Sequence, residues 1–145
     1  MANVFSMPPG LASLEMVTVG DARNEPDGRA MQDGTVGYGS VAHTYAIGKY
    51  EVTAGQYCEF LNAVAKSDPY GLYCTDMSYI GPGCRISRSG LSGSYTYRVN
   101  ADSVNRPVNW VSYWDACRFA DWLHNNQPTS FRAPATWQRG GSAVC

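Results

Sequence analysis

Cysteine and histidine are the residue types in this chain that could supply a reactive thiol or hold a metal ion. The sequence of 145 residues contains five cysteines and two histidines. No C-x-x-C pair occurs, and His43 and His124 lie far apart, so the spacing of a zinc site is absent. Asp115 and Asp121 are six residues apart and do not share a helical face, so they give no argument for paired carboxylates. We therefore predict no metal site and no catalytic residue from these residues.

The five cysteines leave several pairings open. Cys74 and Cys84 bracket the stretch TDMSYIGPG, whose Gly-Pro-Gly turn could bring them together. We favour a local disulfide over two unpaired thiols, and such a bridge would indicate an oxidising compartment. Cys58 and Cys117 each fall inside a predicted helix, either as small buried side chains or as a bridge between the helices. Cys145 is terminal and has no predicted partner.

Length and composition indicate one domain with many turns. Hydrophobic residues make up 44% of the chain and charged residues 16%, with 15 glycines and 8 prolines. This composition favours irregular backbone over a helical bundle. The net charge of −1, with scattered Lys and Arg, excludes the basic stripe of a nucleic-acid-binding protein. No apolar run approaches the ~20 residues of a membrane span.

Two further features bear on location and binding. The start MANVFSMPPG lacks the charged and apolar regions of a signal peptide. We expect a secreted or extracytoplasmic protein whose native signal peptide is absent from this chain. Ten tyrosines and four tryptophans stand against only two lysines, a balance common among extracellular β-rich binding modules. The alternative is that these rings fill the core and line turns.

The first half of the chain predicts two strands followed by a helix. Strands are expected over 13–19 and 41–52, the second interrupted by Gly48, with a long loop over 20–40 between them. Thr53, with a glutamine three residues later, predicts the capped start of a helix that runs to about residue 66. Its buried face is expected to carry the following residues at helical spacing: Tyr57, Phe60, Leu61 and Val64.

The second half predicts coil, a short strand and a second helix. Residues 72–106 are irregular except for SYTYRV, in which Tyr95, Tyr97 and Val99 alternate onto one face. Ser112 is the expected N-cap of a helix that ends near 124–126. Its buried stripe is expected to comprise Ala116, Phe119, Ala120 and Leu123, with Trp122 at the edge. Residues 127–145 are expected to form a loop.

Two strand-to-helix junctions resemble signatures of the formylglycine-generating-enzyme family, also called the sulfatase-modifying-factor domain. Residues 47–61, IGKYEVTAGQYCEFL, are similar to the N-terminal signature of that family. Residues 107–116, PVNWVSYWDA, look like its P-V-x-x-V-S-W-x-D-A signature. The strand and glycine at 16–20 match the family's opening, and 131–137 is a weak match to its R-L-P-T-E-x-E-W element. The resemblance covers roughly 13–126 well and 127–145 poorly.

This resemblance implies an α+β fold of the C-type-lectin-like kind, with two helices, short antiparallel strands and much coil. It makes the chain a single domain over 1–145, truncated, with a poorly matching tail over 127–145. Enzymes of the family oxidise a sulfatase cysteine to formylglycine with copper held by a cysteine pair, whereas other members bind ligands. We expect this chain to lack the catalytic cysteine segment. Ala120 stands where the family helix often has cysteine, and Cys117 lies one turn earlier.

Two function classes follow. The first is a non-catalytic binding or self-assembly module, and its candidate ligand or interface residues are Tyr70, Tyr73, Tyr79, Trp110 and Trp114. The alternative is part of a formylglycine-generating-type oxidase whose catalytic half is missing or supplied in trans. We predict no cofactor, since copper or calcium is implied by family analogy only. The expected partner is a second copy of the chain, because a truncated core would expose apolar surface and strand edges, with a protein or glycan ligand as a further partner.

Overall fold

The computed structural model describes residues 3–5 and 13–129, with only the backbone given for 3–5. These residues fall into two compact units. The first holds 3–5 and 14–50, and the second holds residue 13 and residues 51–129. Both α-helices belong to the second unit, and within the described part of the chain no helix is long and apolar enough to cross a membrane.

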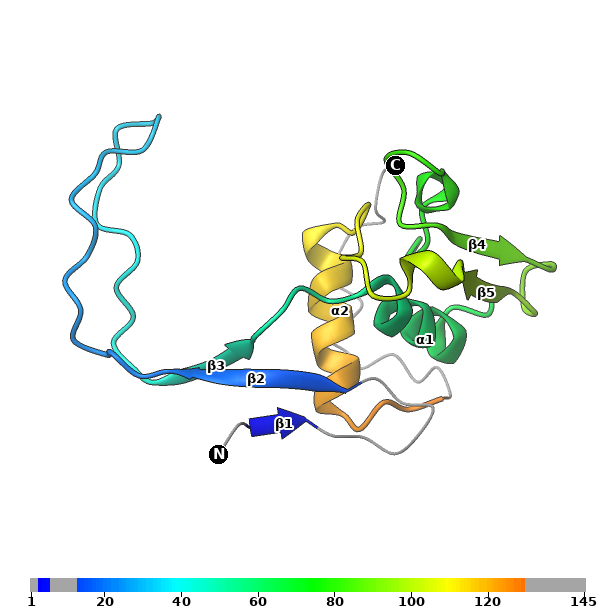
Figure 1. The fold of residues 1–145 in the computed structure, drawn as a ribbon, viewed down its shortest axis with the longest axis horizontal. Helices are drawn as coiled ribbons and strands as arrows, with labels where there is room; N and C mark the ends of the chain where they lie inside the picture. Colours follow the sequence, from blue (N-terminus) through cyan, green and yellow to red (C-terminus); the bar gives the residue numbers. More distant parts are fainter. Residues whose placement is uncertain (1–2, 6–12, 130–145) are drawn as a thin grey trace. The chain divides into compact units, whose positions relative to one another are not determined.

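The first unit is a three-stranded antiparallel sheet (Figure 1, blue to cyan). Its strands are β1 (Asn3–Phe5), β2 (Leu14–Val19) and β3 (Tyr45–Gly48), in the order β1-β2-β3. β2 pairs with β3 from Met16 opposite Gly48 to Val19 opposite Tyr45. The long connection between β2 and β3 folds back on itself, with an isolated bridge between Asp27 and Tyr38. The sequence therefore predicted both long strands, but β3 is shorter than the expected 41–52.

The second unit contains the helices α1 (Ala54–Val64) and α2 (Tyr113–His124) and a small ribbon, β4 (Ile86–Ser89) with β5 (Thr96–Val99). Two short 3-10 turns, η1 (Thr75–Ser78) and η2 (Ala101–Ser103), connect these elements. Both helices begin with a capping box, in which the N-cap side chain and the third helical residue exchange hydrogen bonds. This confirms the predicted starts at Thr53 and Ser112, although no strand was expected at β4.

Aromatic packing between the two helices forms the core of the second unit. Phe60 of α1 is fully buried, and its ring lies within 5.5 Å, between centroids, of the rings of Tyr57, Phe119 and Trp122. All four predicted residues of the α1 stripe are buried. On α2 the stripe was partly wrong. Phe119 and Leu123 are buried, but both predicted alanines are exposed, because the buried face turns toward an interior ion pair and Trp122.

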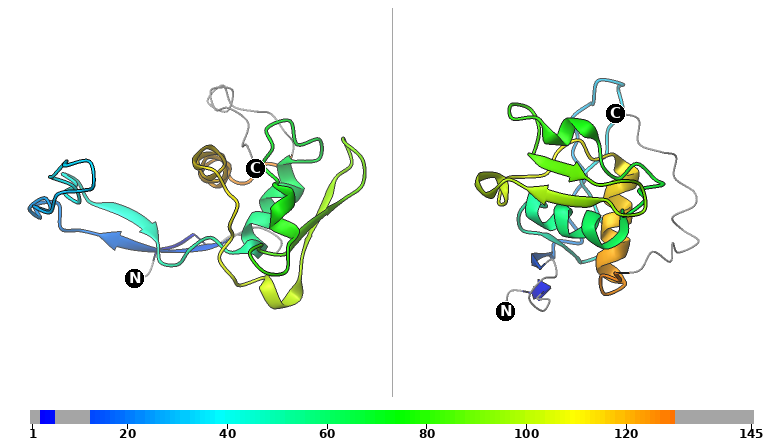
Figure 2. Two further views of the ribbon diagram at one scale, coloured as in Figure 1. Left: turned by 90° about the horizontal axis from the view of Figure 1, so that it is seen from above. Right: turned by 90° about the vertical axis from the view of Figure 1, so that its right-hand side faces the viewer.

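The β4–β5 ribbon packs on α1 (Figure 2), and a side-chain amide provides part of the contact. Asn62 donates from Nδ2 to the Tyr97 carbonyl at 2.9 Å, and its Oδ1 accepts from the Tyr97 N–H at 2.9 Å. The amide thus pairs with Tyr97 as the backbone of a neighbouring strand would. Tyr97 is buried and donates from its hydroxyl to the Ala65 carbonyl at 2.8 Å, which fastens the ribbon to the end of α1.

Candidate functional site

The two junctions singled out in the sequence lie side by side. Val108 N–H donates to the Val52 carbonyl at 2.9 Å, and Ala54 N–H donates to the Arg106 carbonyl at 2.8 Å. Between these bonds, Thr53 and Pro107 form an isolated antiparallel bridge. The chain entering α1 is therefore paired with the chain that leads toward α2, so the two motifs form one structural feature.

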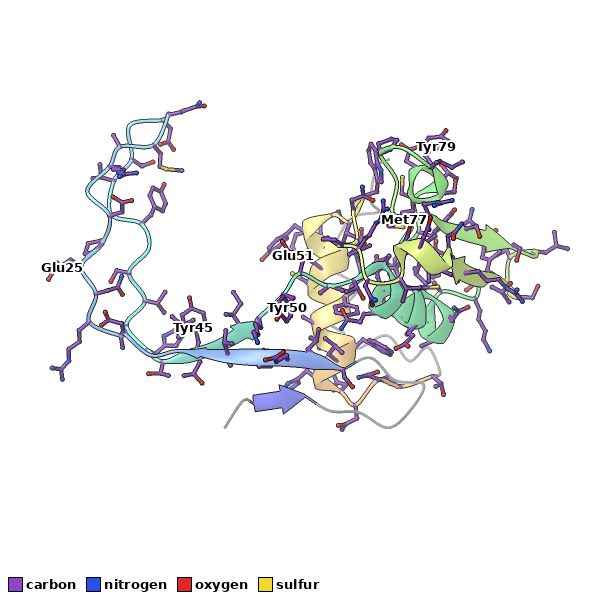
Figure 3. The ribbon with its side chains drawn as sticks, viewed as in Figure 1. Glu25, Tyr45, Tyr50, Glu51, Met77 and Tyr79 are labelled. Carbon is purple, nitrogen blue, oxygen red and sulfur yellow. The ribbon has the colours of Figure 1, made fainter. Side chains whose placement is uncertain are left out.

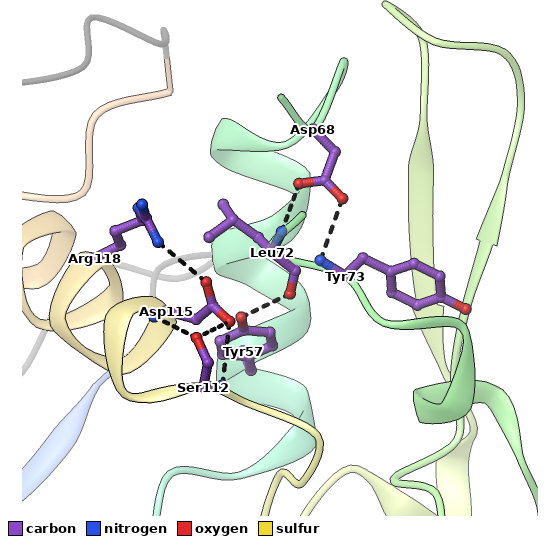
Figure 4. A network of polar contacts seen from close by, with 7 residues as sticks. All are labelled: Tyr57, Asp68, Leu72, Tyr73, Ser112, Asp115 and Arg118. Atoms are coloured by element: carbon purple, nitrogen blue, oxygen red, sulfur yellow. Dashed lines mark hydrogen bonds and ion pairs between the residues drawn. The ribbon is translucent and has the colours of Figure 1, made fainter. Parts of the chain in front are cut away.

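A buried polar network holds the start of α2 (Figure 4). The carboxylate of Asp115 accepts from Ser112 Oγ at 2.6 Å and from the Ser112 N–H at 3.1 Å. Its other oxygen accepts from an Arg118 guanidinium nitrogen at 3.3 Å, and both charged side chains are almost fully buried. A buried ion pair adds little net stability, but removing one partner is strongly destabilising, so both side chains are held in place. The network fixes the path of the chain on which Trp110 and Trp114 lie.

A second carboxylate shapes the loop after α1. Asp68 has a φ of 46° and accepts from the N–H groups of Leu72 at 2.7 Å and Tyr73 at 3.2 Å (Figure 4). Tyr57 donates to the Leu72 carbonyl at 2.8 Å, which ties this loop to α1. Burial raises the pKa of Asp68, and these hydrogen bonds together with Arg88 at 3.5 Å oppose that increase. The hydrogen bonds and the ion pair therefore explain why the Asp68 carboxylate is buried, and no ligand is needed to explain it.

Three of the five predicted surface residues are exposed, and two are not. Tyr79, Trp110 and Trp114 each keep more than 40% of their area in solvent. Tyr73 is only 8% exposed and packs with its ring 5.4 Å from that of Tyr97, so it is a core residue and does not belong to a binding surface. Tyr70 is half-buried beneath the Arg118 guanidinium, whose carbon lies 4.9 Å from the ring centroid.

The exposed aromatic residues come from two segments that are joined. Asn109 donates from its side-chain amide to the Pro82 carbonyl, which links the loop 79–84 to the segment 109–114. Sequence reasoning missed two exposed members of these segments, Ile80 and Tyr113, which lie beside predicted ones. We define the aromatic surface as the following five residues, which are between 44% and 79% exposed: Tyr79, Ile80, Trp110, Tyr113 and Trp114.

Trp110 has an unusual backbone for a bulky residue. Its φ of 59° lies in the left-handed region, where a side chain costs about 1–3 kcal/mol unless the surroundings hold it. The Asn109–Pro82 bond precedes it, and the capped start of α2 follows it. This geometry leaves Trp110 44% exposed to solvent. No signal in the amino-acid sequence predicts this conformation, since glycine is the residue expected there.

The cysteines correct one prediction. Cys84 is a free buried thiol, so the expected Cys74–Cys84 disulfide does not form and no longer supports an oxidising compartment. The Cys84 sulfur instead lies 3.9 Å from the Met77 carbonyl. Cys74 is not a free thiol. Cys58 and Cys117 are both free, which excludes a bridge between the helices, and Cys145 also lies outside the described part.

The described residues do not fit the metals that the resemblance implies. A copper site of the expected kind needs two converging thiolates. Burial raises the pKa of Cys58 to about 11, so this thiol stays protonated at neutral pH, whereas Cys117 is exposed on α2. Calcium prefers several oxygen ligands, and residues 13–129 contain no cluster of three or more His, Cys, Asp or Glu side chains that could hold a metal ion.

The first unit carries a small open hollow of about 240 Å³ at the base of the β2–β3 connection. It is lined by Val19, Asp21, Asn24, Gly39, Val41, His43 and Tyr45. The Asn24 amide donates to the Gly39 carbonyl at 3.1 Å, so this polar group is used in holding the loop. The hollow is smaller than the roughly 300–1,000 Å³ of typical ligand pockets, and we assign it no ligand.

Comparison with known proteins identifies the family. A sequence profile of the sulfatase-modifying factor enzyme 1-like domain matches residues 6–143, which includes the tail that the quoted motifs matched poorly. Separate comparisons with curated proteins and with solved structures gave no match. The described residues form two α-helices, small antiparallel sheets and much coil, which agrees with the α+β class expected from the signatures. The chain therefore belongs to the sulfatase-modifying factor enzyme 1-like (FGE-sulfatase) domain family.

Proposed function

We propose that this chain is a non-catalytic binding module that recognises a protein partner through the aromatic surface. The proposal rests on one observation: three large aromatic side chains, Trp110, Tyr113 and Trp114, are exposed to solvent within five consecutive residues at the start of α2. Tryptophan and tyrosine are enriched among the residues that dominate protein–protein binding energy. They combine large apolar area with a polar group and few rotatable bonds, so little conformational entropy is lost on binding.

The surface is also held rigidly, which lowers the cost of binding. The Asn109–Pro82 bond fixes one side, and the buried Ser112, Asp115 and Arg118 network fixes the other. The Tyr113 and Trp114 rings lie 5.3 Å apart in an edge-on arrangement, so they support each other. The left-handed backbone at Trp110 is further support, because strained residues that point to solvent are concentrated at functional sites.

The alternative, a part of a formylglycine-generating-type oxidase, receives less support from the described residues. That chemistry needs reactive thiolates, and thiolate character depends on a lowered pKa. Cys58 has the opposite shift, because burial raises its pKa to about 11. Cys84 is also buried, and Cys117 is on a different helix from Cys58.

Site-specific photo-crosslinking in cells that produce the protein tests the proposal. A photoreactive phenylalanine analogue in place of Trp114 should give a recurrent protein adduct, and Trp110→Ala should reduce its yield. The matched control places the same analogue at Ala120, which is exposed on another face of the same helix. Equal adducts at the two positions would contradict the proposal. Conversion of a sulfatase-peptide cysteine to an aldehyde by the purified chain would favour the oxidase instead.

A further inference from the structure

One face of the β2–β3 ribbon carries a ladder of exposed apolar side chains. Val17 lies opposite Ile47, and Val19 lies opposite Tyr45, so all four project from the same face. They are between 37% and 51% exposed, and Figure 3 shows Tyr45 on this ribbon. The next rung is the Glu15–Lys49 ion pair, with 2.7 Å between Nζ and Oε1. Two of the cross-strand pairs on this face are therefore apolar, and in the third pair the charges of Glu15 and Lys49 cancel each other.

The outer edge of β3 is open. Lys49 N–H donates to the Glu15 carbonyl, and in an antiparallel pair such bonds alternate along the strand. Tyr45 and Ile47 therefore direct their backbone groups toward β2, whereas Ala46 and Gly48 direct theirs away from it. No hydrogen bond from the backbone groups of Ala46 or Gly48 to another described residue is formed on that side. β3 is short, with four residues, but it contains no proline, charged residue or bulge, three of the devices that usually protect an edge.

We propose that β3 is a self-association site, at which a second copy adds its own β3 antiparallel across a two-fold axis at Ala46. Because Ala46 points its backbone groups outward, the pair Ala46–Ala46 can exchange both hydrogen bonds. The same register places Tyr45 of each copy opposite Ile47 of the other. Two three-stranded sheets then become one continuous sheet of six strands.

A second copy fits this edge better than an unrelated strand for two reasons. The register creates two aromatic–β-branched cross-strand pairs on one face, each contributing roughly 0.2–1 kcal/mol. It also joins the apolar ladders of both copies into a single row, which a two-fold interface requires of a self-complementary patch. A charged partner has less to gain, because Glu15 and Lys49 already neutralise each other. The site is in the first unit and is independent of the aromatic surface.

Disulfide trapping tests the register. In a Cys117→Ser background, Ala46→Cys should form a covalent dimer under mild oxidation, because a hydrogen-bonded pair has Cα atoms about 5.5 Å apart, within disulfide range. Thr18→Cys is the matched control. Thr18 is opposite Ala46 on β2, so two copies of it would be separated by three strand spacings, about 14 Å. Covalent dimer should form several-fold faster with Ala46→Cys than with Thr18→Cys.

Edge blocking tests the hydrogen bonds. Ala46→Pro removes an N–H that does not pair with β2, so it should abolish the dimer in sedimentation velocity while the ribbon is kept. Ala46→Ser keeps the N–H and should remain dimeric. A monomer at all concentrations would overturn the proposal. So would a dimer that persists in Ala46→Pro and is not trapped by Ala46→Cys, an outcome that leaves the proposed binding at Trp110 and Trp114 untouched.

Discussion

The amide of Asn62 offers the sharpest test of how the second unit is held together. Its Nδ2 donates to two carbonyls, those of Tyr97 at 2.9 Å and Cys58 at 3.0 Å, while Oδ1 accepts from the Tyr97 N–H. Asn62→Asp keeps the size and the acceptor but replaces the donor by a carboxylate oxygen. At pH 8 that oxygen would face two carbonyl oxygens at hydrogen-bonding distance.

The expected loss follows from these bonds. Two donated hydrogen bonds are removed, each worth about 1 kcal/mol, and the repulsion between oxygens adds to this. We expect Asn62→Asp to reduce the free energy of unfolding by about 2–4 kcal/mol at pH 8. With a urea dependence of about 1.5 kcal/mol per molar, the unfolding midpoint would fall by roughly 1.3–2.7 M. Asn62→Ala, which removes these three bonds and the longer contact with the Cys58 sulfur without adding charge, should lose about 2–3 kcal/mol.

The pH dependence separates the charge from the lost bonds. A carboxyl group facing carbonyls has a raised pKa in the folded state, because only its protonated form can donate. The folded Asn62→Asp protein should therefore regain stability as the pH falls, and lose it as the pH rises through the raised pKa. Asn62→Ala should not show this change between pH 4 and pH 8.

Urea unfolding followed by circular dichroism at 222 nm reports on α1 and α2. The matched control is Asn105→Asp, the same chemical change at an exposed asparagine, which should change the unfolding free energy by less than about 0.5 kcal/mol. If Asn62→Asp were no more destabilising than Asn105→Asp at pH 8, the hydrogen bonds of the Asn62 amide would not stabilise the packing of β5 on α1. Equal effects at pH 4 and pH 8 would refute the repulsion.

Further predictions concern other contacts in the second unit. Asp115→Asn should lower the free energy of unfolding by about 3–5 kcal/mol in urea titrations, because it removes the negative charge that faces the buried Arg118 guanidinium; a loss under 1 kcal/mol would contradict this. Gly83→Ala should lower the melting temperature, since a Cβ there would lie 2.5–2.8 Å from the backbone of the preceding turn, and an unchanged melting temperature would argue against that close packing. Cys117 should react with a maleimide at pH 7 much faster than Cys58, and mass spectrometry of the labelled peptides distinguishes them. Because the unfolded thiol ionises near pH 9 and the folded Cys58 near 11, Cys58 should lower stability between these values, and Cys58→Ala should make the fall smaller; burial also raises the pKa of Tyr57 and Tyr97, which contribute the rest.

Local signals in the sequence predicted the parts of the fold that are determined locally. Thr53 and Ser112 identified both helix starts, because a capping box needs only residues within one helical turn. The buried face of α1 followed from helical spacing alone. The family signatures at 47–61 and 107–116 then indicated the family that the profile match established.

The errors arose where tertiary contacts override local pattern. Spacing assigned two alanines to the core of α2, but the interior ion pair of Asp115 and Arg118 turns the helix so that charged residues are buried. Tyr73 was expected on the surface because it lies in a coil, yet Arg88 and Tyr97 cover its ring. Proximity in sequence suggested the Cys74–Cys84 bridge, whereas the tight turn at Gly83 takes Cys84 toward Met77. The joining of two distant segments into the aromatic surface has no local signal.

The paired capping boxes also govern how this chain can tolerate changes in length. Each box fixes its first helical turn with atoms from four consecutive residues. The position at which each helix begins therefore does not depend on the length of distant loops. An insertion in the turn between β4 and β5, for example at Ser92, would lengthen an exposed hairpin without rotating α2 about its axis. The starts of both helices are thus independent of loop length. Loops of this chain can change in length while the part of the aromatic surface on α2 keeps its orientation.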